Sequence, residues 1–217
     1  MTIFITATNT EVGKTFTSVL LLKTISKIDP SIKLGAFKPI ETGVDSTPLD
    51  AAYLLKTCQE YNNFKSLTPQ EITSYTFLLP AAPFVASNGD INIQKIKDDI
   101  KKMEALCDIL IVEGAGGLMV PITRDYFMID LIKESADFTL LVTPSKLGCI
   151  NDTLLSIEAL KRREIPFDWC INLKDDKEEF SKITEPFYKS YFERYWFLEE
   201  EIKEFAKRLI ALSHQAP

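Results

Sequence analysis

The chain has 217 residues, of which 26% are charged and 46% hydrophobic, and its formal net charge is −6. An acidic chain has no broad basic surface for nucleic acid, and no apolar window approaches the roughly 18 residues of a membrane span. The only histidine is His214, and the four cysteines lack metal-ligand or redox spacing, which argues against histidine-dependent hydrolases and histidine-ligated zinc. With no linker and no signal-like segment, we expect a cytoplasmic protein with a single domain over 1–217.

The first element is the stretch 3–16, IFITATNTEVGKTF, in which an apolar run leads into a small polar loop and Gly-Lys-Thr. This pattern predicts a strand, a phosphate-binding loop and the start of a helix. Lys14 would then reach the β- and γ-phosphates, and the Thr15 hydroxyl would coordinate Mg²⁺. The usual motif has glycine where this chain has Thr8, and no glycine precedes Gly13. A chance Gly-Lys-Thr at an ordinary turn is therefore the alternative.

After a helix that ends near residue 28, the pattern predicts a short strand over 33–39 with Lys38 at its end. Pro39 and Gly43 mark a loop at the carboxyl end of this strand, where open α/β sheets bind ligands. Lys38 and Thr42 are thus expected near the phosphate loop. The alternative for Lys38 is a solvated lysine at a strand end.

A helical pattern covers 49–61, with its N-cap expected at residues 46–47 and Asp50 in its first turn. An acidic residue in a first turn is most often a partner of the helix dipole. Residues 64–90 are rich in Pro, Ser and Thr and are expected to form a wall or lid over a ligand. Residues 91–106 return to a helical pattern.

Residues 108–112, DILIV, predict a strand buried on both faces that leads directly into Glu113 and the glycine-rich segment 114–117, whose glycines let the backbone approach a ligand. In P-loop proteins the strand beside the phosphate loop ends in a carboxylate that binds Mg²⁺ directly or through water. We therefore assign Glu113 to a magnesium site. The alternative is a tight turn with a capping glutamate.

In the remaining chain, strand patterns alternate with helix patterns as far as residue 172, and only helix patterns follow. Further strands are expected at 138–143 and 167–172, and further helices at 127–135, at 151–163 with Asn151 or Asp152 as cap, at 178–191 and at 199–212. This alternation predicts an α/β fold with a parallel β-sheet flanked by helices on both faces, a P-loop NTPase-like three-layer sandwich.

Five segments together resemble the dethiobiotin synthetase family of the biotin pathway. They are TNTEVGKT at 8–15, Lys38-Pro39 with Thr42-Gly43, Asp50, VEGAGG at 112–117 and KLGCIN at 146–151. The resemblance implies an ATP-dependent cyclo-ligase with Mg²⁺ as cofactor. Its substrates would be 7,8-diaminopelargonic acid and CO₂, which become dethiobiotin through a carbamate and a carbamic-phosphoric anhydride, with release of ADP and phosphate.

The same resemblance implies roles for individual residues. Catalysis is assigned to Lys38, Lys14 and Thr10, and metal binding to Thr15, Asp50 and Glu113. The nucleotide is expected to contact Glu11, Val12, Gly13, Lys14, Thr15, Phe16, Asp50, Glu113, Gly114, Ala115, Gly116 and Asn172. The substrate is expected to contact Thr42, Pro80, Gly116, Gly148, Cys149 and Asn151.

The family is a homodimer with an active site shared across the interface. By resemblance, backbone N–H groups near Gly148, Cys149 and Asn151 would bind the substrate carboxylate presented by the other subunit. Two features depart from the family pattern: Ala7 replaces a glycine, and the segment after Asn172 lacks the Pro-containing strand that completes the nucleobase pocket.

The main alternative function is a regulatory P-loop ATPase of the partitioning or septum-positioning type. Those proteins usually have a second lysine five residues before the lysine of Gly-Lys-Thr, and this chain has Asn9 there. A small-molecule kinase and a structural α/β domain without nucleotide affinity are further alternatives. Phosphate release that depends on the diamine would distinguish the synthetase from all three.

Overall fold

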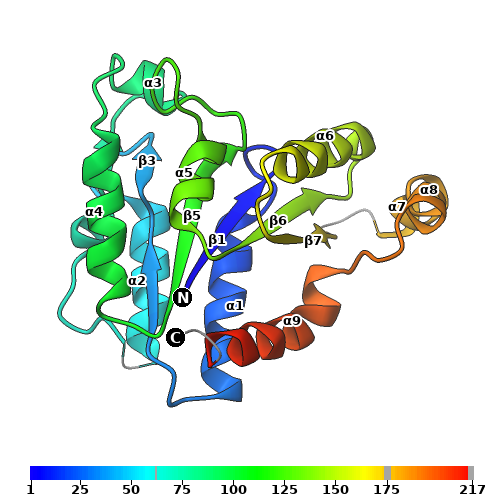
Figure 1. Ribbon diagram of the computed structural model, residues 1–217, viewed down its shortest axis with the longest axis horizontal. Coiled ribbons are helices and arrows are strands. Elements are labelled where there is room, and N and C mark those ends of the chain that lie inside the picture. The colour runs from blue at the N-terminus through cyan, green and yellow to red at the C-terminus, as the bar shows by residue number, and fades with distance from the viewer. Residues whose placement is uncertain (62, 174–176, 215–217) are drawn as a thin grey trace.

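The computed structural model describes residues 1–61, 63–173 and 177–214. Within these ranges the central sheet has five parallel strands in the order β2-β5-β1-β6-β7 (Figure 1). They are β1 (Thr2–Ala7), β2 (Leu34–Phe37), β5 (Ile109–Gly117), β6 (Phe138–Pro144) and β7 (Phe167–Asn172). Because β1 lies at the centre, the loop after it projects from the middle of the sheet edge where the strands end.

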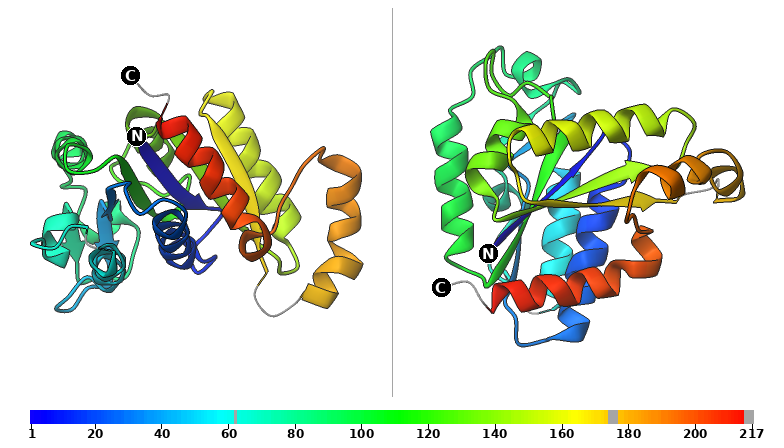
Figure 2. Two further views of the ribbon diagram at one scale, coloured as in Figure 1. Left: turned by 90° about the horizontal axis from the view of Figure 1, so that it is seen from below. Right: turned by 45° about the vertical axis from the view of Figure 1, so that its right-hand side comes forward.

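Helices cover both faces of this sheet. On one face α1 (Lys14–Ile28) packs between α2 (Leu49–Glu60) and α9 (Leu198–Ser213), and the other face carries α4 (Ile93–Glu104), α5 (Met128–Ser135) and α6 (Cys149–Arg162) (Figures 1 and 2). All six residues of β1 are buried, as expected for a strand covered on both sides. The arrangement confirms the predicted parallel sheet with helices on both faces.

β5 continues through the glycine-rich segment after Glu113 to Gly117 and is longer than the predicted strand, so the alternative of a tight turn is wrong. Ile5 of β1 pairs with Glu113, whereas Ala7 pairs with Gly117, so β5 carries extra residues in a bulge between these two pairs. A bulge bends a strand and redirects its side chains and backbone. Here it carries the backbone after Glu113 out of the regular ladder at the end of the sheet.

The region predicted as a loop and a wall contains short regular elements. β3 (Ile40–Thr42) pairs in parallel with β4 (Tyr75–Phe77), and the 3₁₀ helix η1 (Pro69–Ile72) and helix α3 (Pro83–Ala86) lie on either side of β4 in the sequence. The helix predicted over 178–191 is divided into α7 (Lys177–Ile183) and α8 (Glu185–Tyr191). Pro186 explains the division, because proline is accepted in a first turn but not in a helix interior.

Two predicted helix caps are wrong. The N-cap of α2 is Pro48 rather than Ser46 or Thr47, and it has no side-chain hydrogen bond. The N-cap of α6 is Gly148, which has a left-handed φ of 93° and lies three residues before the predicted cap Asn151. Both predictions looked for a local side chain that could cap the helix. A helix start can instead be fixed by backbone conformation or by a residue distant in the sequence, and a local pattern shows neither.

The C-terminal segment joins the main core. Helix α9 forms as predicted, its apolar residues Ile202, Phe205, Ala206 and Leu209 are buried, and it contacts α1 and β7. The four cysteines form no disulfide, and burial raises the pKa of the Cys58 thiol to about 12, which fits a role as apolar filler. In the described part of the chain, no helix combines the length and the apolar character needed to cross a membrane.

Candidate active site

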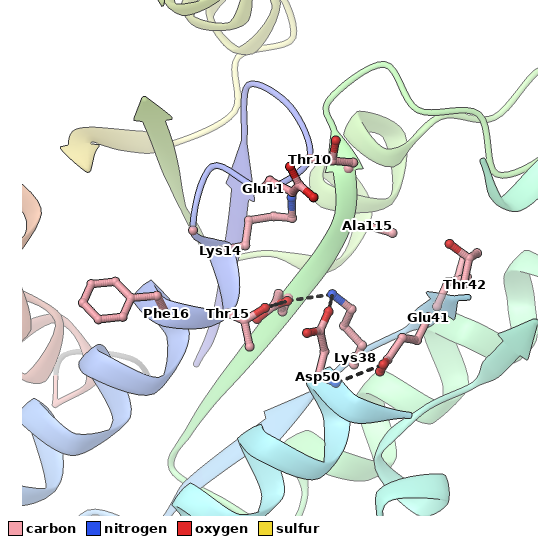
Figure 3. Close-up of a pocket in the computed structure, with 14 residues that line it drawn as sticks. Thr10, Glu11, Lys14, Thr15, Phe16, Lys38, Glu41, Thr42, Asp50 and Ala115 are labelled. Atoms are coloured by element: carbon pink, nitrogen blue, oxygen red, sulfur yellow. Dashed lines mark hydrogen bonds and ion pairs between the residues drawn. The ribbon is translucent and has the colours of Figure 1, made fainter. Parts of the chain in front are cut away.

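A cavity of about 570 Å³ lies where β1, β2 and β5 end. Its walls come from the phosphate loop, the start of α1, the segment after β2, the first turn of α2 and the bulge of β5 (Figure 3). The lining residues are Thr10, Glu11, Gly13, Lys14, Thr15, Phe16, Lys38, Ile40, Glu41, Thr42, Asp50, Glu113, Ala115 and Gly116. Most of the residues predicted for nucleotide and metal binding are thus brought together.

The loop between β1 and α1 opens without a glycine. Its left-handed residues are Glu11, with φ of 58°, and Gly13, with φ of 108°, and neither lies at the start of the loop. Ala7 is simply the last residue of β1 and is fully buried. On the neighbouring strand, a Cβ at Gly117 would lie 2.7 Å from the carbonyl oxygen of Thr8. The space that a loop glycine would provide is therefore supplied by Gly117 of β5.

Asn172, at the end of β7, lies directly against the phosphate loop. Its side-chain Nδ2 donates to the carbonyl oxygen of Val12 at 2.8 Å, and a Cβ at Gly13 would collide with the same amide. Asn172 is buried and supports the loop in this way. Its contact with a nucleobase stays a prediction, and residues 174–176 of the segment expected to complete that pocket lie outside the described residues.

Lys38 is the centre of the charged network. Its Nζ lies 2.6 Å from Glu113 Oε1 and 2.9 Å from Asp50 Oδ2, and it also donates to the carbonyl oxygen of Gly114 at 3.3 Å (Figure 3). Only 3% of Lys38 is exposed, so the alternative of a solvated lysine is wrong. Burial by itself would lower the pKa of Lys38, but the charges of Glu113 and Asp50 outweigh it and raise the pKa. Lys38 is therefore a permanent cation.

Glu113 is fully buried and held from three sides. Besides Lys38, the Thr15 hydroxyl donates to Oε1 at 2.8 Å, and the Ser18 hydroxyl lies 3.0 Å from Oε2. The predicted metal ligands thus lie together: Asp50 and Glu113 both contact Lys38 Nζ, and the Thr15 hydroxyl contacts Glu113. Such hard oxygen donors suit Mg²⁺, which usually takes few protein ligands and completes its shell with phosphates and water. The donor set therefore fits the metal that the sequence predicts.

Lys14 begins α1 beside this network, and its Nζ donates to the carbonyl oxygen of Asn9 in the preceding loop at 3.1 Å. Burial and the nearby charge of Lys38 lower the pKa of Lys14 to about 8, although Glu113 and Asp50 partly oppose the shift. An ammonium that is desolvated and repelled by a second cation gains from an anionic ligand. The site is therefore prepared to accept phosphate.

Some predicted residues do not line the cavity. Val12 and Gly114 contribute carbonyl oxygens behind it, to Asn172 and Lys38, and Pro80 is exposed next to Gly43. The turn of Gly148, Cys149 and Asn151 forms the start of α6 instead. Ile40 and Glu41 also line the cavity, although the sequence did not predict them as site residues. An acidic residue between the two predicted site residues Lys38 and Thr42 was the available signal for Glu41.

Comparison with known families and curated proteins gives a consistent result. Residues 1–188 match the family model of an AAA domain. The chain is 56% identical to the ATP-dependent dethiobiotin synthetase BioD of Sulfurovum sp. (strain NBC37-1), over 95% of this chain and 99% of that protein. It is 36% identical to the protein of the same name from Wolinella succinogenes, over 96% of this chain and 98% of that protein.

Among solved structures, the chain is similar to the MinC:MinD cell division protein complex of Aquifex aeolicus, with a TM-score of 0.53 and 17% identity over 95% of this chain and 85% of that chain. It is also similar to a plasmid partition protein from Borrelia burgdorferi, with a TM-score of 0.54 and 11% identity over 98% of this chain and 96% of that chain. At these identities the similarity shows a shared P-loop NTPase fold and carries no statement about function.

Proposed function

Because this chain belongs to the family of ATP-dependent dethiobiotin synthetases, we propose that the cavity around Lys38 binds ATP, 7,8-diaminopelargonic acid and CO₂ and closes the cyclic urea. The chain is an ATP-dependent ligase of biotin biosynthesis. The observation that supports the location of the site is the convergence of Asp50 and Glu113 on Lys38, beside the Gly-Lys-Thr loop.

The cavity supplies positive charge where two anions must meet. The triphosphate would lie on the N–H groups at the start of α1, with Lys14 beside its β- and γ-phosphates and Thr10 and Glu11 along the loop. Lys38, which stays protonated, would face the transferring phosphoryl group and hold the substrate carbamate. Bringing a carbamate to a triphosphate is mainly a matter of positioning and charge neutralisation.

We propose that Thr15, Asp50 and Glu113 hold Mg²⁺, because the two carboxylates meet at one cation, Lys38, and the Thr15 hydroxyl contacts Glu113. When bound, the metal supplies charge that neutralises the phosphoryl oxygens during transfer. Among the described residues, no group of three or more His, Cys, Asp or Glu side chains is arranged to hold a metal ion. The proposed ligands from the protein are two carboxylates and one hydroxyl. The remaining coordination positions would be filled by phosphate and water.

The proposed reaction has three steps. One substrate amine adds to CO₂ and loses a proton, which gives a carbamate. A carbamate oxygen then takes the γ-phosphoryl group, so that ADP leaves and a carbamic-phosphoric anhydride remains. The second amine attacks the carbonyl carbon, phosphate leaves with the C–O bond electrons, and a proton is lost from nitrogen. Thr42 and Gly116 line the cavity on the side where the substrate would lie.

We propose that the substrate carboxylate binds at the start of α6 of a second copy, since Gly148 and Cys149 do not line the cavity of their own chain. Large apolar side chains exposed near the cavity would be covered in such a homodimer. They are Leu78, Leu79, Phe84, Val85 and Met119. We further propose a single functional domain over 1–217 that works in the cytoplasm, where cysteines without disulfides are usual.

The regulatory ATPase alternative is disfavoured. Its support is a fold similarity at 17% identity or less, whereas the synthetases match along almost their whole length at 56% and 36% identity. Asn9 also stands where those ATPases usually have their second lysine.

The proposed function is tested by giving the purified protein ATP, Mg²⁺, bicarbonate and the diamine, and measuring phosphate release and dethiobiotin by mass spectrometry. We expect phosphate and dethiobiotin in equal amounts, and no phosphate release above background without the diamine. Phosphate release that is indifferent to the diamine would contradict ring closure and favour a switch ATPase.

A further inference from the structure

Glu41 is a buried carboxylate in a cavity that must accept anions. It lines the cavity next to Lys38, Thr42 and Asp50, and only 7% of its surface is exposed (Figure 3). A negative charge beside a triphosphate site opposes ligand binding, and its burial is unfavourable unless hydrogen bonds compensate. The unfavourable free energy of burying the Glu41 carboxylate must therefore be offset by contacts that it makes.

The compensation is visible at the start of α2. The first N–H groups of a helix have no partner inside the helix, and Pro48, the N-cap of α2, provides no side-chain acceptor. Glu41 replaces that acceptor from a distance of nine residues, since Oε1 accepts from Asp50 N at 2.9 Å and Oε2 accepts from Ala51 N at 3.1 Å. Both carboxylate oxygens are therefore used to fix the backbone of the first turn.

This contact also fixes the position of Asp50. The Asp50 side chain is 42% exposed, and the contact that holds it is the ion pair with Lys38 at 2.9 Å. Glu113, by contrast, is fully buried and held by Lys38, Thr15 and Ser18. Asp50 is thus the less constrained of the two carboxylates, and the hydrogen bond from its own N–H to Glu41 is the link that ties it to β3.

We propose that Glu41 is a positioning residue that holds Asp50 in place to bind the metal ion and to pair with Lys38. Lys38 and Glu41 lie three residues apart in one chain segment, and Asp50 contacts both through its side chain and backbone. The three residues form a closed loop of contacts in which Asp50 cannot move without breaking one of them. The inference rests on the proposed function, because it deepens the metal role given to Asp50.

The test uses Mn²⁺ as a spectroscopic probe for the metal, titrated into protein saturated with ADP and followed by electron paramagnetic resonance. Substituting an outer residue that orients a metal ligand weakens metal binding by about 10- to 100-fold, so Glu41→Ala is expected to weaken Mn²⁺ binding by about tenfold. Asp50→Asn should weaken it as well. If Glu41 acts through Asp50, adding Glu41→Ala to Asp50→Asn produces little further loss.

Two controls separate positioning from simple helix capping. Asn92 accepts from Lys95 N at the start of α4, which has 12 residues as α2 does, so Asn92→Ala removes a cap of similar kind far from the cavity. It should lower the Tm without changing Mn²⁺ affinity. Adding Pro48→Ser to Glu41→Ala offers α2 a local cap, which should recover Tm but not Mn²⁺ affinity.

The inference is overturned if Mn²⁺ affinity is unchanged in Glu41→Ala, if the losses from Glu41→Ala and Asp50→Asn add independently, or if Pro48→Ser restores Mn²⁺ affinity fully. Failure of the proposed function has a different result. In that case Asp50→Asn itself leaves Mn²⁺ binding unchanged, or the wild-type protein makes no dethiobiotin, whatever Glu41 does.

Discussion

Replacing Lys38 with methionine tests the charge balance of the site. The substitution keeps the length and apolar stem of the side chain and removes the ammonium that pairs with Glu113 at 2.6 Å and with Asp50 at 2.9 Å. Glu113 is then a fully buried carboxylate that keeps hydrogen bonds from the hydroxyls of Thr15 and Ser18. Removing one partner of a buried ion pair is strongly destabilising because the other charge stays behind without compensation.

The expected loss of stability in Lys38→Met follows from the ion pair that it breaks. Breaking a buried pair lowers the free energy of unfolding by about 3–5 kcal/mol. In a chain of this size each kcal/mol lowers Tm by about 2–4 °C, so Lys38→Met should lower Tm by roughly 6–20 °C when metal is removed with EDTA. Part of this loss should return with Mg²⁺ and ADP, since a ligand that binds only the folded state stabilises it and its charge compensates Glu113. Dethiobiotin formation should be abolished while ADP still binds.

Thermal unfolding followed by circular dichroism measures these effects, and Lys207→Met is the matched control. Lys207 pairs with Glu204 at 2.8 Å on the surface of α9, with half of its side chain exposed. A surface pair of this kind contributes at most about 1 kcal/mol. If Lys38→Met lowers Tm no more than Lys207→Met does, the ion pair at the centre of the site does not stabilise the fold and the reasoning is refuted.

Two further predictions concern the phosphate loop. The pKa of Lys14 is about 8 in the folded protein against an ordinary 10.5, so the unfolded chain holds more protons between these values and the free energy of unfolding should rise with pH across that window. A bound triphosphate should raise the pKa of Lys14 again, so the protein should take up a proton when ATP binds. Calorimetry near pH 8.5 in two buffers of different ionisation enthalpy measures this uptake, and Lys14→Met should abolish it. Equal binding heats in both buffers would contradict the lowered pKa. Gly117→Ala places a methyl group 2.7 Å from the carbonyl oxygen of Thr8, so the KM for ATP should rise above that of the wild-type protein. An unchanged KM would show that the loop does not need the space.

The residues that the sequence placed correctly share a simple origin. Gly-Lys-Thr and Lys38 follow strands β1 and β2, and Glu113 follows the apolar run of β5. These apolar runs are recognisable, and parallel strands end at the same edge of a sheet. Knowing where each strand ends was therefore enough to predict that their polar side chains meet. The resemblance to one family added Asp50, which helical periodicity alone would have explained as a partner of the helix dipole.

The features that the sequence did not predict depend on contacts between distant segments. β3 has three residues and is a strand because β4 pairs with it, so no periodicity exists to find. The cap of α2 comes from Glu41, and no local pattern announces a carboxylate that reaches a helix start nine residues away. Local propensities cannot contain such information, because the partner group is brought near only by the completed fold.

The phosphate loop shows why a motif can depart from its usual spacing and still form. Spacing rules assign the required space to glycines inside the loop, and Thr8 breaks such a rule. In this fold Gly117 on β5 leaves the space at the start of the loop free. At the end of the loop Gly13 has no room for a side chain, because the amide of Asn172 occupies that volume. The loop is therefore specified jointly by β1, β5 and β7, and a change in one strand can be offset by the residue that faces it on another.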